Sequence, residues 1–238
     1  MVRGQKPPYY EQLVYLLKSV KLNWDKTQLD YTLYIHHSRP LAKDKQEYLK
    51  SLGCTVVYNE NEVQPYFCRE NILNYKTDGD YTLILDTDMI VLNTPSLVFD
   101  REIYVRRADT PGLSDQQWED AYNRFGMTYV KDDINHFNGG CFLIKNSCKQ
   151  KMYDQLVSKE GLRILKTLEE YDRHMSVQFY YSLLVKQLQW GLLNKRVNVF
   201  SHTLEHTDPE RSVDILHYLG TYGYTDTVKN LLNQLKEI

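Results

Sequence analysis

The spacing of apolar residues over the first 90 positions alternates between the periods typical of helices and of strands. Leu13, Leu16, Leu17 and Val20 share one helical face after Pro8, and further helices are predicted over residues 41–52 and 65–75. Runs of β-branched, aromatic and leucine residues predict strands between them, at 31–36, 55–58 and 81–85. This alternation is typical of an α/β fold with a mainly parallel central sheet and helices on both faces.

Beyond residue 100 the alternation is less regular. Strands are predicted over 102–107, 137–144, 197–200 and 213–216, and helices over 114–125, 149–168 and 173–188. A last helix is amphipathic, because Val228, Leu231, Leu232 and Leu235 lie on one stripe. We expect this stripe to dock on the protein core rather than on a membrane.

Two carboxylates, Asp86 and Asp88, follow the apolar strand predicted at 81–85. A strand without polar interruption is typical of a sheet buried on both faces, and ligands bind beyond the carboxyl ends of such strands. Neighbouring carboxylates repel each other unless a cation or a proton lies between them, and their hard oxygens suit magnesium or manganese. The pattern predicts a metal–phosphate site. The alternative is a simple turn, since Asp favours turns.

Composition narrows the classes of protein to which the chain can belong. The 238 residues are 42 % hydrophobic and 25 % charged, which is typical of a globular chain, and a net charge of −2 provides no basic field for nucleic acid. No run is long enough to span a bilayer, and the N-terminus lacks the apolar core of a signal peptide. The four cysteines include no Cys-x-x-Cys pair. These features predict a soluble, cytoplasmic protein.

Four ordered segments carry a family resemblance. In the first, Arg69 and Asn71 lie in a predicted helix, and Gly79-Asp80-Tyr81 and Leu85-Asp-Thr-Asp88 follow. The others are His-Phe-Asn-Gly-Gly-Cys-Phe-Leu-Ile at 136–144, Glu-Tyr-Asp-Arg-His-Met-Ser-Val-Gln at 170–178 and Ile-Leu-His-Tyr-Leu-Gly at 215–220. The set resembles GT-A nucleotide-sugar glycosyltransferases, and the three later segments are similar to those of glycogenin-like members.

The resemblance implies a single transferase domain over 1–238, with a nucleotide-binding half at 1–100 and a sugar and acceptor half at 101–238. It implies that Asp86, Asp88 and His217 bind Mn²⁺ or Mg²⁺, with His202 and His206 as rivals of His217. The donor, expected to be a UDP-sugar, would contact Arg69, Asp86, Asn138, Gly139, Gly140 and Gly220. The acceptor would be a glycan or a protein hydroxyl, and neither nucleic acid nor a transmembrane segment is expected.

Asp172 is the candidate catalytic carboxylate, and Asp109 and Asp115 are its alternatives. Candidates for the acceptor side, each with core packing as the default interpretation, are Trp118, Tyr122, Phe125 and Tyr222.

The chain departs from the family pattern at three places. Residues 1–6 are short and polar where the family has a hydrophobic strand, which leaves open that the chain is part of a larger protein. Asp172-Arg173 replaces the family's Asp-Gln, and residues 221–224 replace its Lys-Pro-Trp. Two rival functions are a haloacid-dehalogenase-type phosphatase, although Ile90 occupies its Thr or Val position, and a non-catalytic sugar-binding module with a transferase fold.

Overall fold

Helices and strands are interspersed along the described part of the chain. The computed structural model describes residues 8–25, 27, 30–37, 40–58, 71–131, 133–204, 212–218 and 225–237. The strands are β1 (Leu33–His37), β2 (Cys54–Tyr58), β3 (Tyr81–Leu85), β4 (Met89–Val91), β5 (Ile103–Arg107), β6 (Phe137–Lys145), β7 (Trp190–Leu192), β8 (Val199–Phe200) and β9 (Ile215–His217). The helices are α1 (Tyr9–Trp24), α2 (Lys43–Ser51), α3 (Asn71–Asn74), α4 (Asp115–Arg124), α5 (Asn146–Val157), α6 (Lys159–Tyr171), α7 (Ser176–Val185), α8 (Ser201–Leu204) and α9 (Asp226–Lys236).

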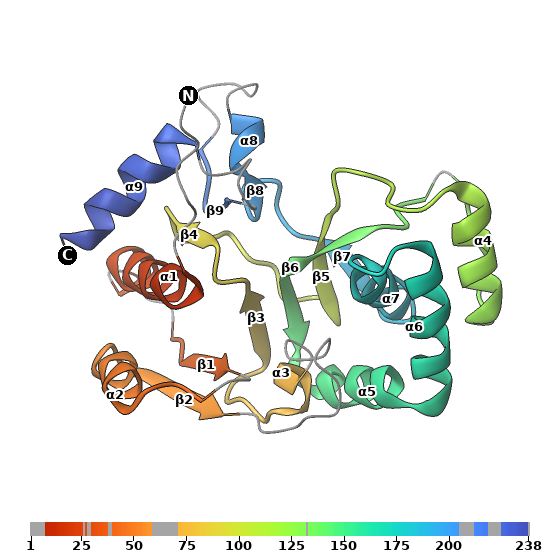
Figure 1. Ribbon diagram of the computed structural model, residues 1–238, viewed down its shortest axis with the longest axis horizontal. Helices are drawn as coiled ribbons and strands as arrows, with labels where there is room; N and C mark the ends of the chain where they lie inside the picture. Colours follow the sequence, from red (N-terminus) through yellow and green to blue (C-terminus); the bar gives the residue numbers. More distant parts are fainter. Residues whose placement is uncertain are drawn as a thin grey trace.

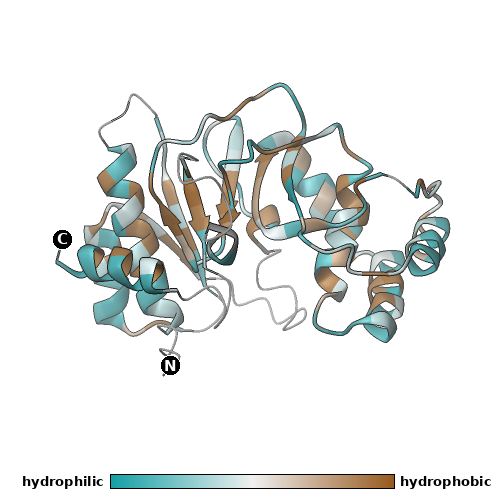
Figure 2. Ribbon diagram, turned by 90° about the horizontal axis from the view of Figure 1, so that it is seen from above, coloured by the Kyte–Doolittle hydropathy of each residue, from teal (hydrophilic) through white to brown (hydrophobic). Residues whose placement is uncertain are grey.

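Strand β6 is buried on both faces, which explains its apolar sequence. Phe142 and Ile144 belong to a hydrophobic core formed with α4, α5, α6 and α7. Cys141 and Leu143, which alternate with them, belong to a second core formed with α1 and β4. Side chains alternate between the faces of a strand, so a strand between two helical layers must be apolar at every position. Figure 2 shows this arrangement as brown strands between helices whose outer faces are mostly teal.

The α/β fold class expected from the sequence is confirmed, but the strand pairing is mixed rather than mainly parallel. Among the described residues the strands form three sheets, ordered β1-β2, β3-β6-β5-β7 and β4-β9-β8. Strand β6 runs antiparallel to both β3 and β5, and β4 runs antiparallel to β9, while β1-β2, β5-β7 and β8-β9 are parallel. Figure 1 shows these sheets side by side, with α1 and α9 beside β4 and α5 to α7 beside β6.

Helix α1 completes the side of β4 that faces away from β9. The hydroxyl of Ser19 accepts a hydrogen bond from the backbone N–H of Val91 (2.9 Å), and Asn23 Nδ2 donates to the Val91 carbonyl (2.9 Å). Ser19 is buried, and its side chain also donates to the Leu16 carbonyl. Side chains of a helix therefore satisfy backbone groups that a neighbouring strand would otherwise satisfy.

The predicted helix over 149–168 is wrong as a single element, because the structure divides it at Ser158. The backbone of Ser158 is extended (φ −63°, ψ 155°), which ends α5, and its hydroxyl accepts from Gly161 N–H at 2.9 Å, which caps α6. Strand β7 was not predicted. The helix expected over 65–75 is described only for Asn71–Asn74, since 65–70 lie outside the described residues. No helix among the described residues is long and apolar enough to cross a membrane.

Candidate metal and donor site

Strand pairing brings three candidate ligands together from distant parts of the chain. The backbone N–H of Asp86 continues the β3–β6 ladder by donating to the Gly140 carbonyl at 2.8 Å. His217 lies opposite Met89 in the β4–β9 pair, and the next residue, Tyr218, donates its backbone N–H to the Asp88 carbonyl at 3.0 Å. A separation of 129 residues between Asp88 and His217 is thereby closed.

The side chains of Asp86, Asp88 and His217 converge on one point. One possible ligand atom from each residue lies within 4.8 Å of the others, and His217 Nε2 is 3.2 Å from Asp88 Oδ1. His217 is buried and the Asp88 side chain is 14 % exposed, so the group is largely shielded from solvent. These are the three residues that the sequence resemblance named as metal ligands, and their grouping is compatible with a metal site.

Hydrogen bonds determine which nitrogen of His217 carries the proton. The backbone N–H of Gly140 can only donate, so the Asn138 atom 2.9 Å from it is the oxygen Oδ1. That oxygen also accepts from Asn198 Nδ2 at 3.0 Å, which turns the Asn198 oxygen toward His217 Nδ1 at 2.8 Å. Nδ1 therefore carries a proton and donates it to Asn198, which leaves Nε2 as the ring nitrogen that can bind a metal through its lone pair.

These residues fit a divalent cation. The Nε2 lone pair and the Asp88 carboxylate oxygen are both acceptors, so they attract each other only through a cation or an added proton. Metal-binding histidines usually donate their second N–H to an oxygen, as His217 does to Asn198. Carboxylates suit Mg²⁺ and Mn²⁺, while an imidazole favours a transition ion, so the set suits Mn²⁺ best.

Gly140 is the close neighbour of this group. A Cβ at this position would lie 2.7 Å from His217 Cε1, 2.9 Å from Asp86 Oδ2 and 3.0 Å from Asn138 Oδ1. Only glycine leaves room for these side chains in their present positions. The thiol of the next residue, Cys141, is buried. Its burial, and to a smaller extent the negative charge of Asp86, raise its pKa, so the thiol stays neutral.

We expect Asn198→Gly to weaken Mn²⁺ binding by about 10- to 100-fold, as is usual for residues that orient a metal ligand. Asn198 is fully buried and has a positive φ of 57°, so glycine keeps the backbone conformation while removing the amide that orients His217. Mn²⁺ titration calorimetry measures the loss. The melting temperature of the metal-free variant is the control. It should stay close to that of the metal-free wild type if the fold is kept. Unaltered Mn²⁺ affinity in Asn198→Gly would remove Asn198 from the site.

A second contact joins β6 to α7. The side-chain oxygen of Gln178 accepts from the backbone N–H of Gly139 at 3.2 Å, one residue before Gly140. Asp172, the expected catalytic residue, lies six positions earlier, after the end of α6. Its carboxylate accepts from the backbone N–H groups of His174 (2.9 Å) and Met175 (3.2 Å). Among the described contacts, Gln178 therefore joins residues 170–178 to the Gly139-Gly140 pair.

The alternatives to Asp172 lie in different surroundings. Asp109 Oδ2 is 3.9 Å from His202 Nε2, and the His202 ring stacks on Phe200, which in turn contacts the ring of His217. Asp109 is thus linked to the metal group through two aromatic side chains. Asp115 begins α4, where it pairs with Lys131 at 3.0 Å and accepts from the Tyr129 hydroxyl at 2.9 Å.

Several predicted residues fall elsewhere. Trp118 and Tyr122 are buried in the core with α6 and α7, and Phe125 packs against that core, so packing is the interpretation that holds for them. The residues that lie outside the described part of the chain are Arg69, His206, Gly220 and Tyr222.

Sequence reasoning missed Asn198 and Gln178. Asn198 follows no motif, and its only signal is that asparagine tolerates a positive φ. Gln178 ends one of the segments that carried the family resemblance, but the carboxylate of Asp172 was the stronger chemical signal there. Both roles depend on side chains meeting across elements, which one sequence does not reveal.

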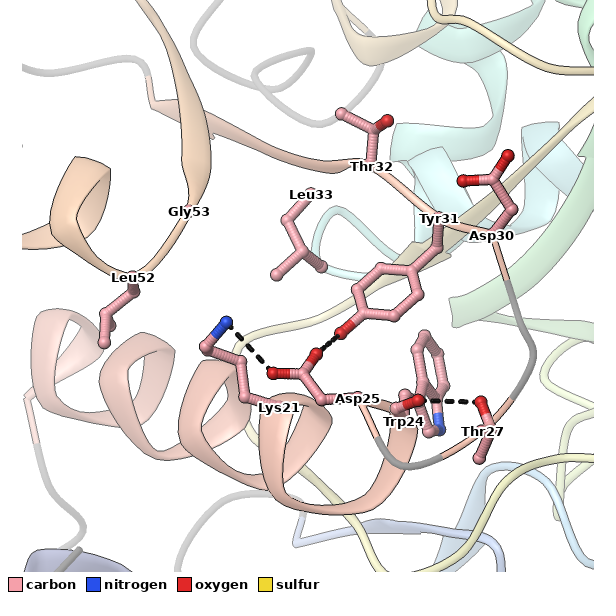
Figure 3. Close-up of a pocket in the computed structure, with 10 residues that line it drawn as sticks. All are labelled: Lys21, Trp24, Asp25, Thr27, Asp30, Tyr31, Thr32, Leu33, Leu52 and Gly53. Atoms are coloured by element: carbon pink, nitrogen blue, oxygen red, sulfur yellow. Dashed lines mark hydrogen bonds and ion pairs between the residues drawn. The ribbon is translucent and has the colours of Figure 1, made fainter.

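A pocket of about 460 Å³ lies at the C-terminal end of α1. Figure 3 shows it between the end of α1, the start of β1 and the turn before β2. Asp25 pairs there with Lys21 at 3.2 Å and accepts from the Tyr31 hydroxyl, so these polar groups satisfy one another. Gln12, near the start of α1, contacts Thr87 between the two ligand carboxylates. Trp24 lies twelve positions after Gln12 in the helix, so the pocket is about 18 Å from the site along the helix.

Comparison with models of known protein families gave no match, and comparison with curated protein sequences gave none. Solved structures do match. Two structures of LgtC superpose with TM-scores of 0.64 and 0.59 at 14 % and 15 % identity, over 96 % and 97 % of this chain and 92 % and 94 % of LgtC. One is described as an active-site glutamine-to-glutamate mutant, the other as a galactosyltransferase in complex with donor and acceptor sugar analogues.

Two further matches are more distant. The apo form of mouse xyloside xylosyltransferase 1 has a TM-score of 0.55 at 14 % identity, over 89 % of this chain and 92 % of that one. The apo glycosyltransferase GlyE of Streptococcus pneumoniae TIGR4 has a TM-score of 0.52 at 17 % identity, over 96 % of this chain and 60 % of that one. The chain therefore has the GT-A fold of these glycosyltransferases.

Proposed function

We propose that the protein is a metal-dependent glycosyltransferase that transfers a sugar from a nucleotide-sugar, with a UDP-sugar as the expected donor, to a hydroxyl of a glycan or protein. The observation that carries this proposal is the convergence of Asp86, Asp88 and the Nε2 lone pair of His217 beside Gly140. A bound divalent cation supplies Lewis acidity toward the diphosphate leaving group. The GT-A fold supports the assignment by analogy.

Each residue of the site has a proposed role that follows from its position. Asp86, Asp88 and His217 hold the cation, and Asn198 orients His217. Asn138, Gly139 and Gly140 form the strand beside the metal and border the donor sugar, while Gln178 extends that border from α7. Arg69 and Gly220 remain proposed donor contacts on the sequence resemblance. The separation into nucleotide and sugar halves near residue 100 is part of the same proposal.

The deciding experiment is an assay of nucleoside diphosphate release from a panel of UDP- and GDP-sugars, with and without Mn²⁺. Mn²⁺-dependent release of UDP supports the proposal. A preference for GDP-sugars would overturn the nucleotide assignment alone. Release of phosphate from a sugar phosphate would indicate the phosphatase function, and Mn²⁺-dependent nucleotide-sugar binding without turnover would indicate the non-catalytic module.

Asp172→Asn is expected to lower kcat with little change in nucleotide affinity, if its carboxylate interacts mainly with the transition state. The substitution preserves size and leaves an oxygen to accept from the His174 and Met175 backbone, so the local turn should persist. Steady-state kinetics and UDP calorimetry measure the two quantities separately. Wild-type kcat in this variant excludes Asp172, and Asp109 is then the carboxylate to test, because it alone of the alternatives is linked to the metal group.

A further inference from the structure

A buried histidine holds the Gln178 amide against β6. His136 Nε2 is 2.8 Å from Gln178 Nε2, and His136 Nδ1 is 2.7 Å from the carbonyl oxygen of Thr110. Gln178 Oε1 accepts from Gly139 N–H at 3.2 Å. The three contacts form a continuous chain from the loop after β5, through His136, to the strand that borders the metal group.

The chain has one consistent arrangement of protons. The Thr110 carbonyl can only accept, so His136 Nδ1 carries a proton and Nε2 of the neutral ring is an acceptor. The Gly139 N–H can only donate, so the Gln178 oxygen faces it and the Gln178 nitrogen faces His136. The backbone groups at both ends thus independently require the same orientation of the amide.

Protonation of His136 has no comparable arrangement. A second ring proton on Nε2 would face the donor N–H of Gln178. Rotating the amide by 180° would bring its oxygen to His136 but would turn its N–H toward the N–H of Gly139. Either orientation places two donors against each other, so the Gln178 side chain must leave β6 when His136 is charged.

The surroundings of His136 favour the neutral ring. His136 is 4 % exposed and contacts the aromatic rings of Trp118 from α4 and Phe179 from α7. Burial lowers the pKa of His136, and the hydrogen bond to Thr110 opposes this in part. No charged side chain among the described residues contributes to that shift. Gly112 closes over the ring, since a Cβ there would lie 2.9 Å from His136 Cε1.

We propose that His136 is a positioning residue of the sugar site, whose neutral imidazole holds the Gln178 amide against Gly139 and releases it on protonation. The inference rests on the proposed function for its catalytic consequence, since the amide lies one residue from Gly140. The structural part, which is the coupling of the His136 ring to the Gln178 amide, stands apart from activity.

Nuclear magnetic resonance of the metal-free, substrate-free protein tests the coupling directly. The Gln178 side-chain NH₂ signals, assigned with Gln178→Glu, should shift as the pH falls below the ordinary pKa of histidine, with the same midpoint as the His136 ring signals. In His136→Gln, whose oxygen can accept from Gln178 at every pH, this shift should be absent. Gln178→Glu should raise the midpoint of the His136 ring by more than about one pH unit, because a carboxylate can face both donors. Independent midpoints for the two side chains would overturn the proposal.

Kinetics tests the consequence. We expect His136→Leu to lower kcat about tenfold or more with little change in the Kd for UDP, because the amide loses its fixed position. His136→Gln should recover most of that loss and move the acid limb of the pH profile to lower pH. Ser182→Ala is the matched control, since it removes a hydrogen bond between α7 and β6 (Phe137 N–H to Ser182 Oγ, 3.0 Å) but leaves the His136 ring nitrogens and the Gln178 amide with their partners.

The two variants and the control separate positioning from general loosening. If His136→Gln and His136→Leu lose kcat equally, or if Ser182→Ala reproduces the changed pH profile, His136 is only a packing residue. A wild-type protein without any transfer activity but with coupled midpoints would refute the proposed function and leave the coupling intact.

Discussion

Replacing Asp88 with asparagine is expected to lower the Mn²⁺-dependent affinity for UDP by at least about 100-fold, since even residues that only orient a ligand contribute about 10- to 100-fold. The neutral amide is a much weaker metal ligand than a carboxylate, and its N–H₂ can donate to the Nε2 lone pair of His217, 3.2 Å away, which occupies the atom that should bind the metal. Isothermal titration calorimetry with UDP, with and without Mn²⁺, measures the loss.

The same variant should be at least as stable as the wild type in the absence of metal. Asp88→Asn relieves the repulsion between two neighbouring carboxylates, and its amide can accept from or donate to the buried His217 ring in either protonation state. Mn²⁺ should raise the melting temperature of the wild type and leave that of the variant unchanged. Asp226→Asn is the matched control and should keep the Mn²⁺ response, because the Asp226 side chain on α9 is 91 % exposed. An Mn²⁺-induced rise in Asp88→Asn equal to that of the wild type would contradict the ligand assignment.

Gly140→Ala is expected to cost about 1–3 kcal/mol of folding stability, as overpacking usually does, and to abolish Mn²⁺ binding as well. The new methyl group would approach His217 Cε1 at 2.7 Å and Asp86 Oδ2 at 2.9 Å, so two of the three ligands would have to move. UDP and UDP-sugar should both lose affinity in the presence of Mn²⁺. Urea denaturation and Mn²⁺ calorimetry measure the two effects.

Gly126→Ala separates this effect from the general cost of a new side chain. Gly126 has a φ of +68°, and apart from its own chain neighbours no described residue lies within 4 Å of the place that a Cβ would take, so alanine there strains only the backbone. It should cost about 1 kcal/mol, the usual penalty for a left-handed alanine, without altering Mn²⁺ affinity. Normal Mn²⁺ affinity in Gly140→Ala would show that the ligands can move aside, and that the glycine is needed only for the sugar.

Much of the fold could be read from local patterns. The strands at β1, β3, β5 and β6 and the amphipathic helices α1 and α9 follow from periodicity, because each has a long enough apolar face. The directions of strand pairing could not be read, since β6 meets β3 and β5 through contacts that connect distant segments. The break at Ser158 was missed because one serine acts both as the end of α5 and as the cap of α6, within a continuous helical pattern.

The site was predictable only in part for the same reason. Asp86 and Asp88 carry a local signal, two carboxylates at the end of an apolar strand. His217 was reached through the family resemblance, because nothing near it in the sequence distinguishes it from a histidine that simply packs in the core. Asn198, Gln178 and His136 act through hydrogen bonds to backbone groups and side chains on other elements, and this information exists only after folding.

The hydrogen bonds from α1 to β4 have a consequence for the behaviour of the chain in concentrated solution. An unpaired strand edge is a template on which another copy can add a strand, and β4 is apolar at all three of its positions, Met89, Ile90 and Val91. Ser19 and Asn23 occupy the N–H and C=O of Val91, so a second chain finds no free backbone group at that residue. Helix α1 therefore blocks edge-to-edge association at Val91. Partial unfolding that detaches α1 would expose the edge of β4, directly beside Asp88.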